Sequence, residues 1–297
     1  MGIFFAILSP ALYSVVNYVD KFLLEKYHIH PTVIALYSGS VAAVASLGIL
    51  FFTGFHLFPF MTSLILITSG FLTMLTLIPY FKALSLDETS RVIPLFQMVP
   101  LFVLVLSFIF LQEVMTMKQY IGSFCIIFAA FLLSVEKVDA KIFRLRKAFF
   151  YMVIASVLSA ISLILFKVGV GEIDFWHTLP YEGLGIVLGS LAIISYKDNI
   201  STLLVQTKKL PKKLFLFISL NEVIFVSSRY TAFFALSLIP ASLVSVLSGF
   251  QPFFVLCLGV ILSLFIPHLI KELLSKETIL LKVFASVIIL IGIYLIS

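Results

Sequence analysis

Two oppositely charged side chains, Glu222 and Arg229, interrupt the apolar stretch 214–236. They are seven residues apart, which places them two turns apart on one face of a helix. Inside a membrane each would cost at least about 2.5–3.5 kcal/mol, so the default hypothesis is a functional one. With Asn221 and Tyr230 beside them, they could bind a polar substrate or carry protons. The alternative is a structural ion pair in which Arg229 reaches Glu222 or another helix. The functional interpretation is favoured because apolar residues replace a lone structural pair at little cost.

Other polar residues fall at similar depth in apolar stretches. Gln97 and Gln251 lie near Pro100 and Pro252, where each amide could face a substrate or satisfy the carbonyl that a proline leaves free. Asparagines and serines at such depth can equally hold helices together. The predicted substrate-binding residues are Tyr13, Asn17, Tyr80, Gln97, Ser162, Asn221, Glu222, Arg229, Tyr230 and Gln251, and Glu222 is also the predicted coupling residue.

Several charged residues receive a more ordinary interpretation. Asp20 and Lys21 are expected near the membrane interface, and Lys82 is expected to extend its amine to the interface. Glu182 is a weaker site candidate, because its apolar run also contains Pro180 and several glycines.

The composition excludes a water-soluble fold. Of 297 residues, 62% are hydrophobic and 11% are charged, whereas soluble domains are about half apolar and about a quarter charged. The surplus apolar surface could not be buried in a fold of this size. The net charge of +6 is therefore interpreted as an orienting charge in membrane loops, and no nucleic-acid partner is expected.

The chain contains ten apolar runs long enough to cross a bilayer, which takes about 20 residues in a helix. Continuous apolarity indicates helices and not the alternating strands of a barrel. Residues 197–213 are expected to be a polar connection. The seventh run is expected to be short, broken or partly lining a cavity, and 266–278 could form a short interfacial helix. The runs are 2–24, 32–53, 61–84, 90–111, 118–135, 147–168, 176–196, 214–238, 242–265 and 279–296.

The two halves of the chain repeat each other. The segment that begins at Ala83, ALSLDETSRVIPLFQMVPLFVLVL, aligns without gaps to the one at Ala235, ALSLIPASLVSVLSGFQPFFVLCL. Each segment covers the corner between the third and fourth helices of a five-helix unit. Because five is odd, two such units must lie in opposite orientations. The predicted fold is an all-α integral membrane protein with ten transmembrane helices in two inverted five-helix repeats, divided as 1–136, a basic linker 137–147, and 148–297.

The loop charges give an independent indication of this inversion. The second loop, TGFHLFP, has no Lys or Arg, whereas its counterpart at 197–213 has five lysines. Corresponding loops thus carry opposite bias, as inverted repeats should. Loops rich in Lys and Arg are expected to lie in the cytoplasm. With this orientation, both termini lie outside.

The chain resembles the EamA-type branch of the drug/metabolite transporter superfamily. The resemblance rests on the run at 81–133 and its echo at 234–297. It includes the step Leu111-Gln112-Glu113 at the end of the fourth helix, with Glu272 or Glu277 as the candidate counterpart in the second half. The resemblance implies ten helices in two halves and an amino acid-like or drug-like substrate. It also implies termini in the cytoplasm, in conflict with the loop charges.

Inverted repeats are typical of secondary transporters, because two similar units can exchange conformations across the membrane. The sequence therefore predicts a carrier of a small solute by alternating access in a prokaryotic cytoplasmic membrane. Glu222 would couple transport to protons, because burial favours the neutral form of a carboxylate. The alternatives are a flippase for lipid-linked substrates, or its subunit, and an integral-membrane enzyme.

No cofactor or metal is expected, because Cys125 and Cys257 lie in apolar runs and the histidines lie near loops. The expected partners are a small-molecule substrate and membrane lipids, for a monomer or homodimer.

Overall fold

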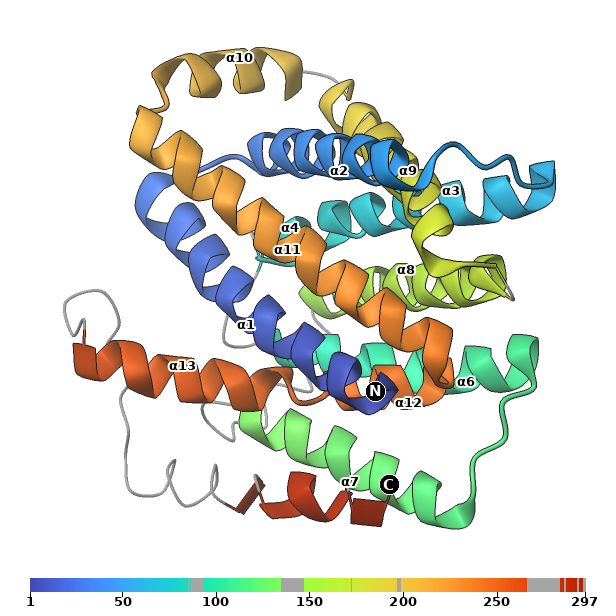
Figure 1. Ribbon diagram of the computed structural model, residues 1–297. Coiled ribbons are helices and arrows are strands. Elements are labelled where there is room, and N and C mark those ends of the chain that lie inside the picture. The colour runs from blue at the N-terminus through green and yellow to red at the C-terminus, as the bar shows by residue number, and fades with distance from the viewer. Residues whose placement is uncertain are drawn as a thin grey trace.

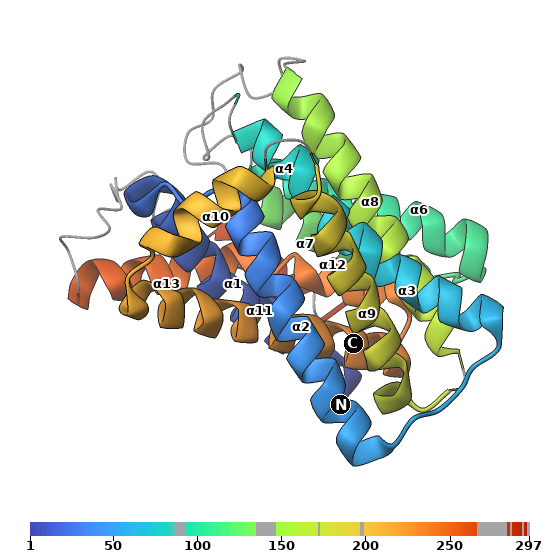
Figure 2. The same cartoon turned by 90° about the horizontal axis from the view of Figure 1, so that it is seen from above.

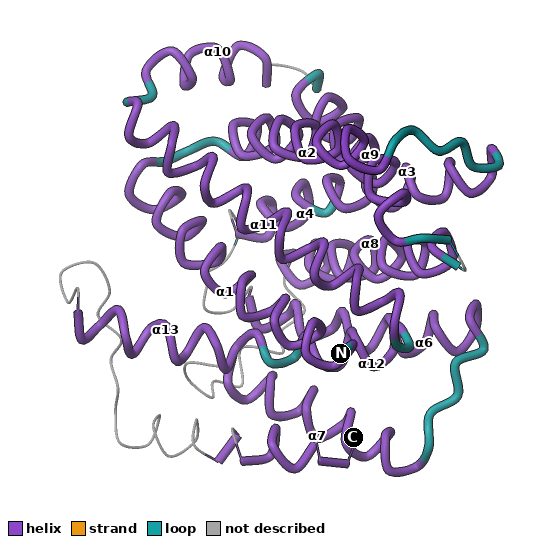
Figure 3. Tube along the Cα trace, in the orientation of Figure 1, coloured by secondary structure: helices purple, strands orange, loops and turns teal. Residues whose placement is uncertain are grey.

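The computed structural model describes residues 1–84, 86, 93–134, 147–171, 173–196 and 199–265, and near the C-terminus 284, 285, 287–292, 294 and 295. All regular structure in these residues is helical (Figures 1 and 3). The helices are α1 (Gly2–Tyr27), α2 (Pro31–Thr53), α3 (Phe60–Leu75), α4 (Leu77–Leu84), the 3-10 helix η1 (Ile93–Met98), α6 (Val99–Leu111), α7 (Met117–Ser134), α8 (Lys147–Val170), α9 (Phe175–Ile194), α10 (Asn199–Lys209), α11 (Lys212–Leu238), α12 (Ala241–Ser248) and α13 (Gln251–Phe265).

The surface of this bundle is suited to lipid. Phe51 and Phe52 on α2 are 84% and 85% exposed, and many other large apolar side chains face outward. Among the described residues, six segments are long and apolar enough to cross a membrane: Gly2–Asp20, Pro31–Thr53, Phe60–Ala83, Lys147–Val170, Phe175–Ile194 and Ala241–Gly259. The protein is an all-α, multi-pass membrane protein, and the count of ten crossings stays a prediction.

Prolines determine where several helices are interrupted. Pro79 has no N–H to donate to the carbonyl of Leu75. The third apolar run is divided at Thr76, between α3 and α4. By contrast, α9 runs through Pro180 as one continuous helix. The expected break in the seventh run is therefore absent.

The fourth helix of each predicted repeat is divided at the same place. In the first half, η1 gives way to α6 just before Pro100. In the second half, α12 ends at Ser248 and α13 begins just before Pro252. The two prolines that the repeat alignment pairs thus stand at equivalent helix breaks.

The connection 197–213 is not a plain loop. Residues Asn199–Lys209 form α10, because Ile200, Leu203 and Leu204 recur at helical spacing on one side of an otherwise polar segment. Gln206 fastens this helix to the loop between α1 and α2: its Oε1 accepts the His30 N–H at 2.8 Å, and its Nε2 donates to the His28 carbonyl. Partial burial lowers the pKa of His30.

The predicted interfacial helix at 266–278 lies outside the described residues.

Helices α2, α3 and α9 form a tightly packed layer, which Figure 2 shows from above. Two glycines allow the backbones of α3 and α9 to touch. A Cβ added to Gly70 would collide with the carbonyl of Glu182, and a Cβ added to Gly185 would collide with the carbonyl of Ile67. Only a residue without a side chain permits this approach.

We expect Gly70→Ala to destabilise the protein by about 1–3 kcal/mol, because the added methyl group meets backbone that cannot move aside. Gly48→Ala is the matched control, since a Cβ there meets open space, and it should be neutral or slightly stabilising through higher helix propensity. Thermal unfolding in detergent micelles measures both. Equal shifts for the two variants would contradict the packing argument.

Candidate functional site

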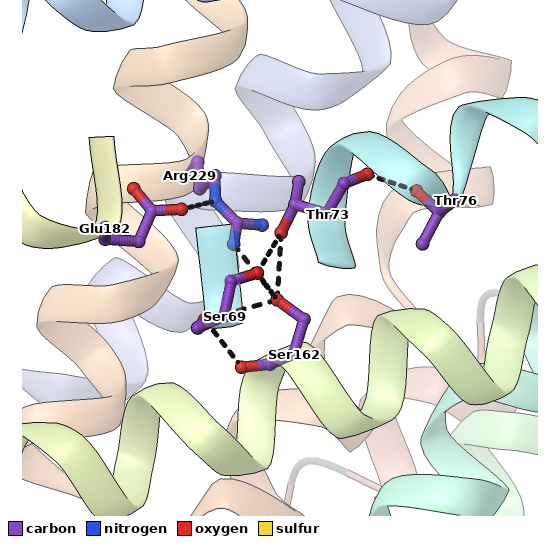
Figure 4. Close-up of polar contacts among 6 residues, drawn as sticks. All are labelled: Ser69, Thr73, Thr76, Ser162, Glu182 and Arg229. Carbon is purple, nitrogen blue, oxygen red and sulfur yellow. Dashed lines mark hydrogen bonds and ion pairs between the residues drawn. The ribbon is translucent and has the colours of Figure 1, made fainter. Parts of the chain in front are cut away.

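Helix α11 carries a buried ion pair at its centre. The Nε of Arg229 donates to Oε1 of Glu182 on α9 at 2.6 Å, and the Glu182 side chain is completely buried (Figure 4). Arg229 thus pairs with α9 and not with Glu222 on its own helix. The seven-residue spacing of Glu222 and Arg229 does place both side chains in the interior, where they join two different polar clusters.

The first cluster, here called the arginine cluster, joins α11 to α3, α8 and α9. Nη2 of Arg229 donates to the Ser162 hydroxyl at 3.2 Å. The Ser162 and Ser69 hydroxyls each donate to the other residue's backbone carbonyl at 2.8 Å. Thr73 completes the network, with its hydroxyl 2.8 Å from that of Ser162 (Figure 4). Every member is buried or half-buried, so the network replaces the water that these groups would otherwise bind.

An aromatic stack supports the same guanidinium. The guanidinium carbon of Arg229 lies 4.3 Å from the ring centroid of Phe233, one turn further along α11. Phe233 in turn stacks on Phe166 of α8, with the ring centroids 3.6 Å apart. The Phe233 ring contacts the face of the guanidinium, whereas the N–H groups of the guanidinium point outward in its plane. This cation–π contact therefore adds to the hydrogen bonds and does not compete with them.

The second cluster, here called the acidic cluster, joins α11 to α1 and α2. The Ser38 hydroxyl donates to Oε2 of Glu222 at 2.5 Å, and Nδ2 of Asn221 donates to Oδ1 of Asp20 at 2.8 Å. Tyr13 interacts electrostatically with both carboxylates. Tyr80 of α4 interacts with Asp20 and Tyr13. Two carboxylates and two phenols from three helices, α1, α4 and α11, therefore share one region of the interior.

Two buried acceptor atoms in these clusters lack a hydrogen-bond donor among the described residues. They are Oε2 of Glu182 and Oδ1 of Asn221. A desolvated acceptor without a donor costs about 1–3 kcal/mol. Each of these atoms could accept a hydrogen bond from a ligand that carries an N–H or O–H donor. In the described part of the chain, no group of three or more His, Cys, Asp or Glu could hold a metal ion.

The structure divides the predicted site residues between these clusters. Ser162 and Arg229 belong to the arginine cluster, and Tyr13, Tyr80, Asn221 and Glu222 belong to the acidic cluster. Tyr230 is next to Arg229 and interacts electrostatically with Glu182.

Three of the predicted residues lie elsewhere. Asn17 on α1 and Gln251 at the start of α13 are partly buried and take no part in the hydrogen bonds of either cluster. The side chain of Gln97 lies outside the described residues.

Five residues of the clusters were not among the predicted site residues: Asp20, Ser38, Ser69, Thr73 and Glu182, of which Glu182 was a weaker candidate. Asp20 was expected at the interface, yet it is seven residues from Tyr13 and hence on the same face of α1. Ser69 and Thr73 are one turn apart and lie on one face of α3. That spacing is the signal in the sequence that identifies them.

A third set of contacts joins the two halves at the corner between α11 and α12. Gln112 adopts a left-handed conformation with φ of 53° and ends α6. The next residue, Glu113, then reaches the start of α12, where its carboxylate accepts the N–H groups of Ala241 and Ser242 at 2.8 and 3.0 Å and the Ser242 hydroxyl at 2.7 Å. A carboxylate at a helix N-terminus complements the free N–H groups and the helix dipole.

The C-terminal end of α11 is held by a cation. Nζ of Lys167 donates to the carbonyls of Leu236 and Ile239. The same corner is therefore fixed by an anion from the first half and by a cation from α8. The candidate counterparts of Glu113, Glu272 and Glu277, lie outside the described residues.

Comparisons with known proteins agree with this architecture. One solved crystal structure superposes on the chain with a TM-score of 0.71 at 12% identity, covering 100% of this chain and 95% of that one, a likeness that shows the fold alone. No curated protein matches the chain. The sequence profile of the EamA-like transporter family matches residues 1–135. This N-terminal segment is therefore similar to the EamA-like transporters, a family of the drug/metabolite transporter superfamily.

Proposed function

We propose that the protein is a secondary transporter that moves a small metabolite, amino acid-like or drug-like, across the cytoplasmic membrane by alternating access. One observation carries the proposal: charged side chains at membrane depth gather where the two halves of the chain meet. Asp20 and Ser38 of the first half contact Asn221 and Glu222 of the second, and Ser69 contacts Ser162. Charges at such depth are retained for substrate or ion pathways.

The packing supports two exchangeable halves. If α1, α2, α3 and α6 correspond to α8, α9, α11 and α12, exchanging the halves converts the α1–α11 contact into the α8–α3 contact. Both contacts are present, as are the α2–α9 and α6–α12 contacts that map onto themselves. Alternating access requires this kind of equivalence, because the inward- and outward-open states are then related by exchange of the halves.

The divided fourth helices support the same proposal. Interrupted helices at corresponding positions of inverted repeats are the strongest sequence-level indication of a transporter's binding site. Here the breaks occur before Pro100 and before Pro252.

The predicted linker between the halves, 137–147, falls almost entirely outside the described residues.

Proton coupling through Glu222 can be tested in proteoliposomes that contain a pH-sensitive dye. Small polar metabolites are added outside one at a time, and a solute whose transport is coupled to protons changes the lumenal pH. The lumen becomes acidic if protons enter with the solute and alkaline if protons leave in exchange for it. Glu222→Gln should lose the pH change while the protein stays folded, because the amide keeps the size of the side chain but cannot carry a proton. Asp174→Asn, an exposed carboxylate outside both clusters, should keep it. If Glu222→Gln changes the lumenal pH like the wild type, Glu222 is not the coupling residue.

A further inference from the structure

The acidic cluster contains an unused acceptor beside two carboxylates. Asn221 is 2% exposed, and its amide donates through Nδ2 to Asp20. The oxygen of the same amide, Oδ1, is buried and has no donor within the described residues. Glu222, the next residue on α11, is 3% exposed. Three oxygen-bearing groups therefore come together on the facing sides of α1 and α11.

When both of its carboxylates are ionised, the charges of this cluster are not balanced. Asp20 and Glu222 repel each other electrostatically, and neither forms an ion pair within the described residues. Glu182, in contrast, is neutralised by Arg229. Two ionised carboxylates, one buried and one partly buried, are unfavourable without a cation, because the interior does not solvate them as water does. A cation that binds between them removes the repulsion.

We propose that Asp20, Asn221 and Glu222 bind the ammonium group of an organic primary amine. This inference deepens the proposed transport function by naming the charged group of the substrate. A primary ammonium has three N–H donors and no acceptor, which matches two carboxylates and one amide oxygen. Asp20 remains partly exposed, whereas Asn221 and Glu222 are buried.

Aromatic side chains are placed to contact the organic part of such an amine. Tyr13 lies within electrostatic range of Asp20 and Glu222, and its ring centroid is 5.9 Å from that of Phe225. Tyr80 lies close to Asp20 and Tyr13. Aromatic faces attract ammonium groups and also pack against apolar substituents. The arginine cluster is already internally paired, so the site favours a cation over an anion.

The test is ligand-induced thermal stabilisation of the purified full-length protein. The probes are benzylammonium, its neutral counterpart benzyl alcohol, and benzyltrimethylammonium, which has the same charge but no N–H donor. We expect saturable stabilisation by benzylammonium, none by benzyl alcohol, and at least tenfold weaker apparent affinity for the quaternary ion. Asp20→Asn and Asn221→Leu should each weaken benzylammonium binding at least tenfold, and Asp174→Asn should not.

Several results would overturn the inference: no stabilisation by benzylammonium, equal stabilisation by all three probes, or unchanged affinity in both cluster variants. Size-exclusion chromatography identifies which of the two cluster variants fold. One folded variant is sufficient to test the inference. The proposed function fails separately. If benzylammonium binds by these rules and no amine or other metabolite crosses proteoliposomes, the site stands and transport is refuted. If another solute is transported and benzylammonium does not bind, transport stands and the amine assignment is refuted.

Discussion

Glu182→Leu is expected to lower the free energy of unfolding by about 3–5 kcal/mol, because it leaves the Arg229 guanidinium in the interior without its counter-charge. Arg229→Met should have a similar effect, since the Glu182 carboxylate is completely buried. The double variant Glu182→Leu/Arg229→Met removes both charges, and its stability should return to near that of the wild type. Unfolding of the four proteins in detergent micelles gives the coupling energy as a double-mutant cycle.

A surface pair provides the matched control. Oδ2 of Asp174 lies 3.0 Å from Nδ1 of His177, and the Asp174 side chain is 58% exposed. Because solvent screens such a pair, Asp174→Asn should change stability by no more than about 1 kcal/mol. If the double variant of the buried pair instead shows the summed loss of its two single variants, the charges do not stabilise one another and the argument fails.

The same double variant decides between the two interpretations of Arg229. A structural ion pair can be replaced by apolar residues without loss of function, whereas a substrate-contacting pair cannot. We expect the folded double variant to lose solute transport in proteoliposomes. Wild-type transport by this variant would assign Arg229 and Glu182 to packing alone.

The second large effect concerns orientation in the membrane. We expect a cysteine at position 57 to react completely with a membrane-impermeant maleimide on intact cells, and a cysteine at position 212 to react only after lysis. Gln206 ties α10 to the loop between α1 and α2, so Lys26 and Lys212 lie at the same end of the bundle. That basic end should face the cytoplasm, because lysine-rich loops are retained there.

The experiment uses Leu57→Cys and Lys212→Cys in a chain that carries Cys125→Ala and Cys257→Ala. Leu57 is 78% exposed, in a loop that contains no Lys or Arg. Tyr181 holds this loop against the start of α9 by donating to the His56 carbonyl. The reverse labelling pattern would show that the family's usual orientation, with cytoplasmic termini, overrides the loop charges.

Much of the architecture could be predicted from the residues in order. Long apolar runs must form helices in lipid, because only a helix satisfies its own backbone groups. The repeat alignment pairs Pro100 with Pro252, and the structure has a helix break just before each of them. Helix α10 was missed because its apolar face is narrow and is surrounded by lysines and other polar residues, so mean hydropathy does not reveal it.

The sequence placed Glu222 and Arg229 in the interior but did not identify the residues that they contact. Glu222 and Arg229 were recognised because a charge in an apolar run is conspicuous. Their partners could not be recognised in the same way. Ser38 and Ser69 are ordinary residues for a membrane helix, and Asp20 looks like an interfacial residue because Lys21 follows it.

The sequence by itself determined that the protein lies in a membrane, that it is helical, and that its charged residues on α11 are in the interior. These properties depend on composition and on helical periodicity, which are local along the chain. Only the tertiary structure decided that Arg229 pairs with Glu182, that Glu222 meets Ser38, and that Asp20 meets Asn221. Those pairings depend on how helices distant in the chain rotate and pack against one another, which the apolar composition of their surfaces does not specify.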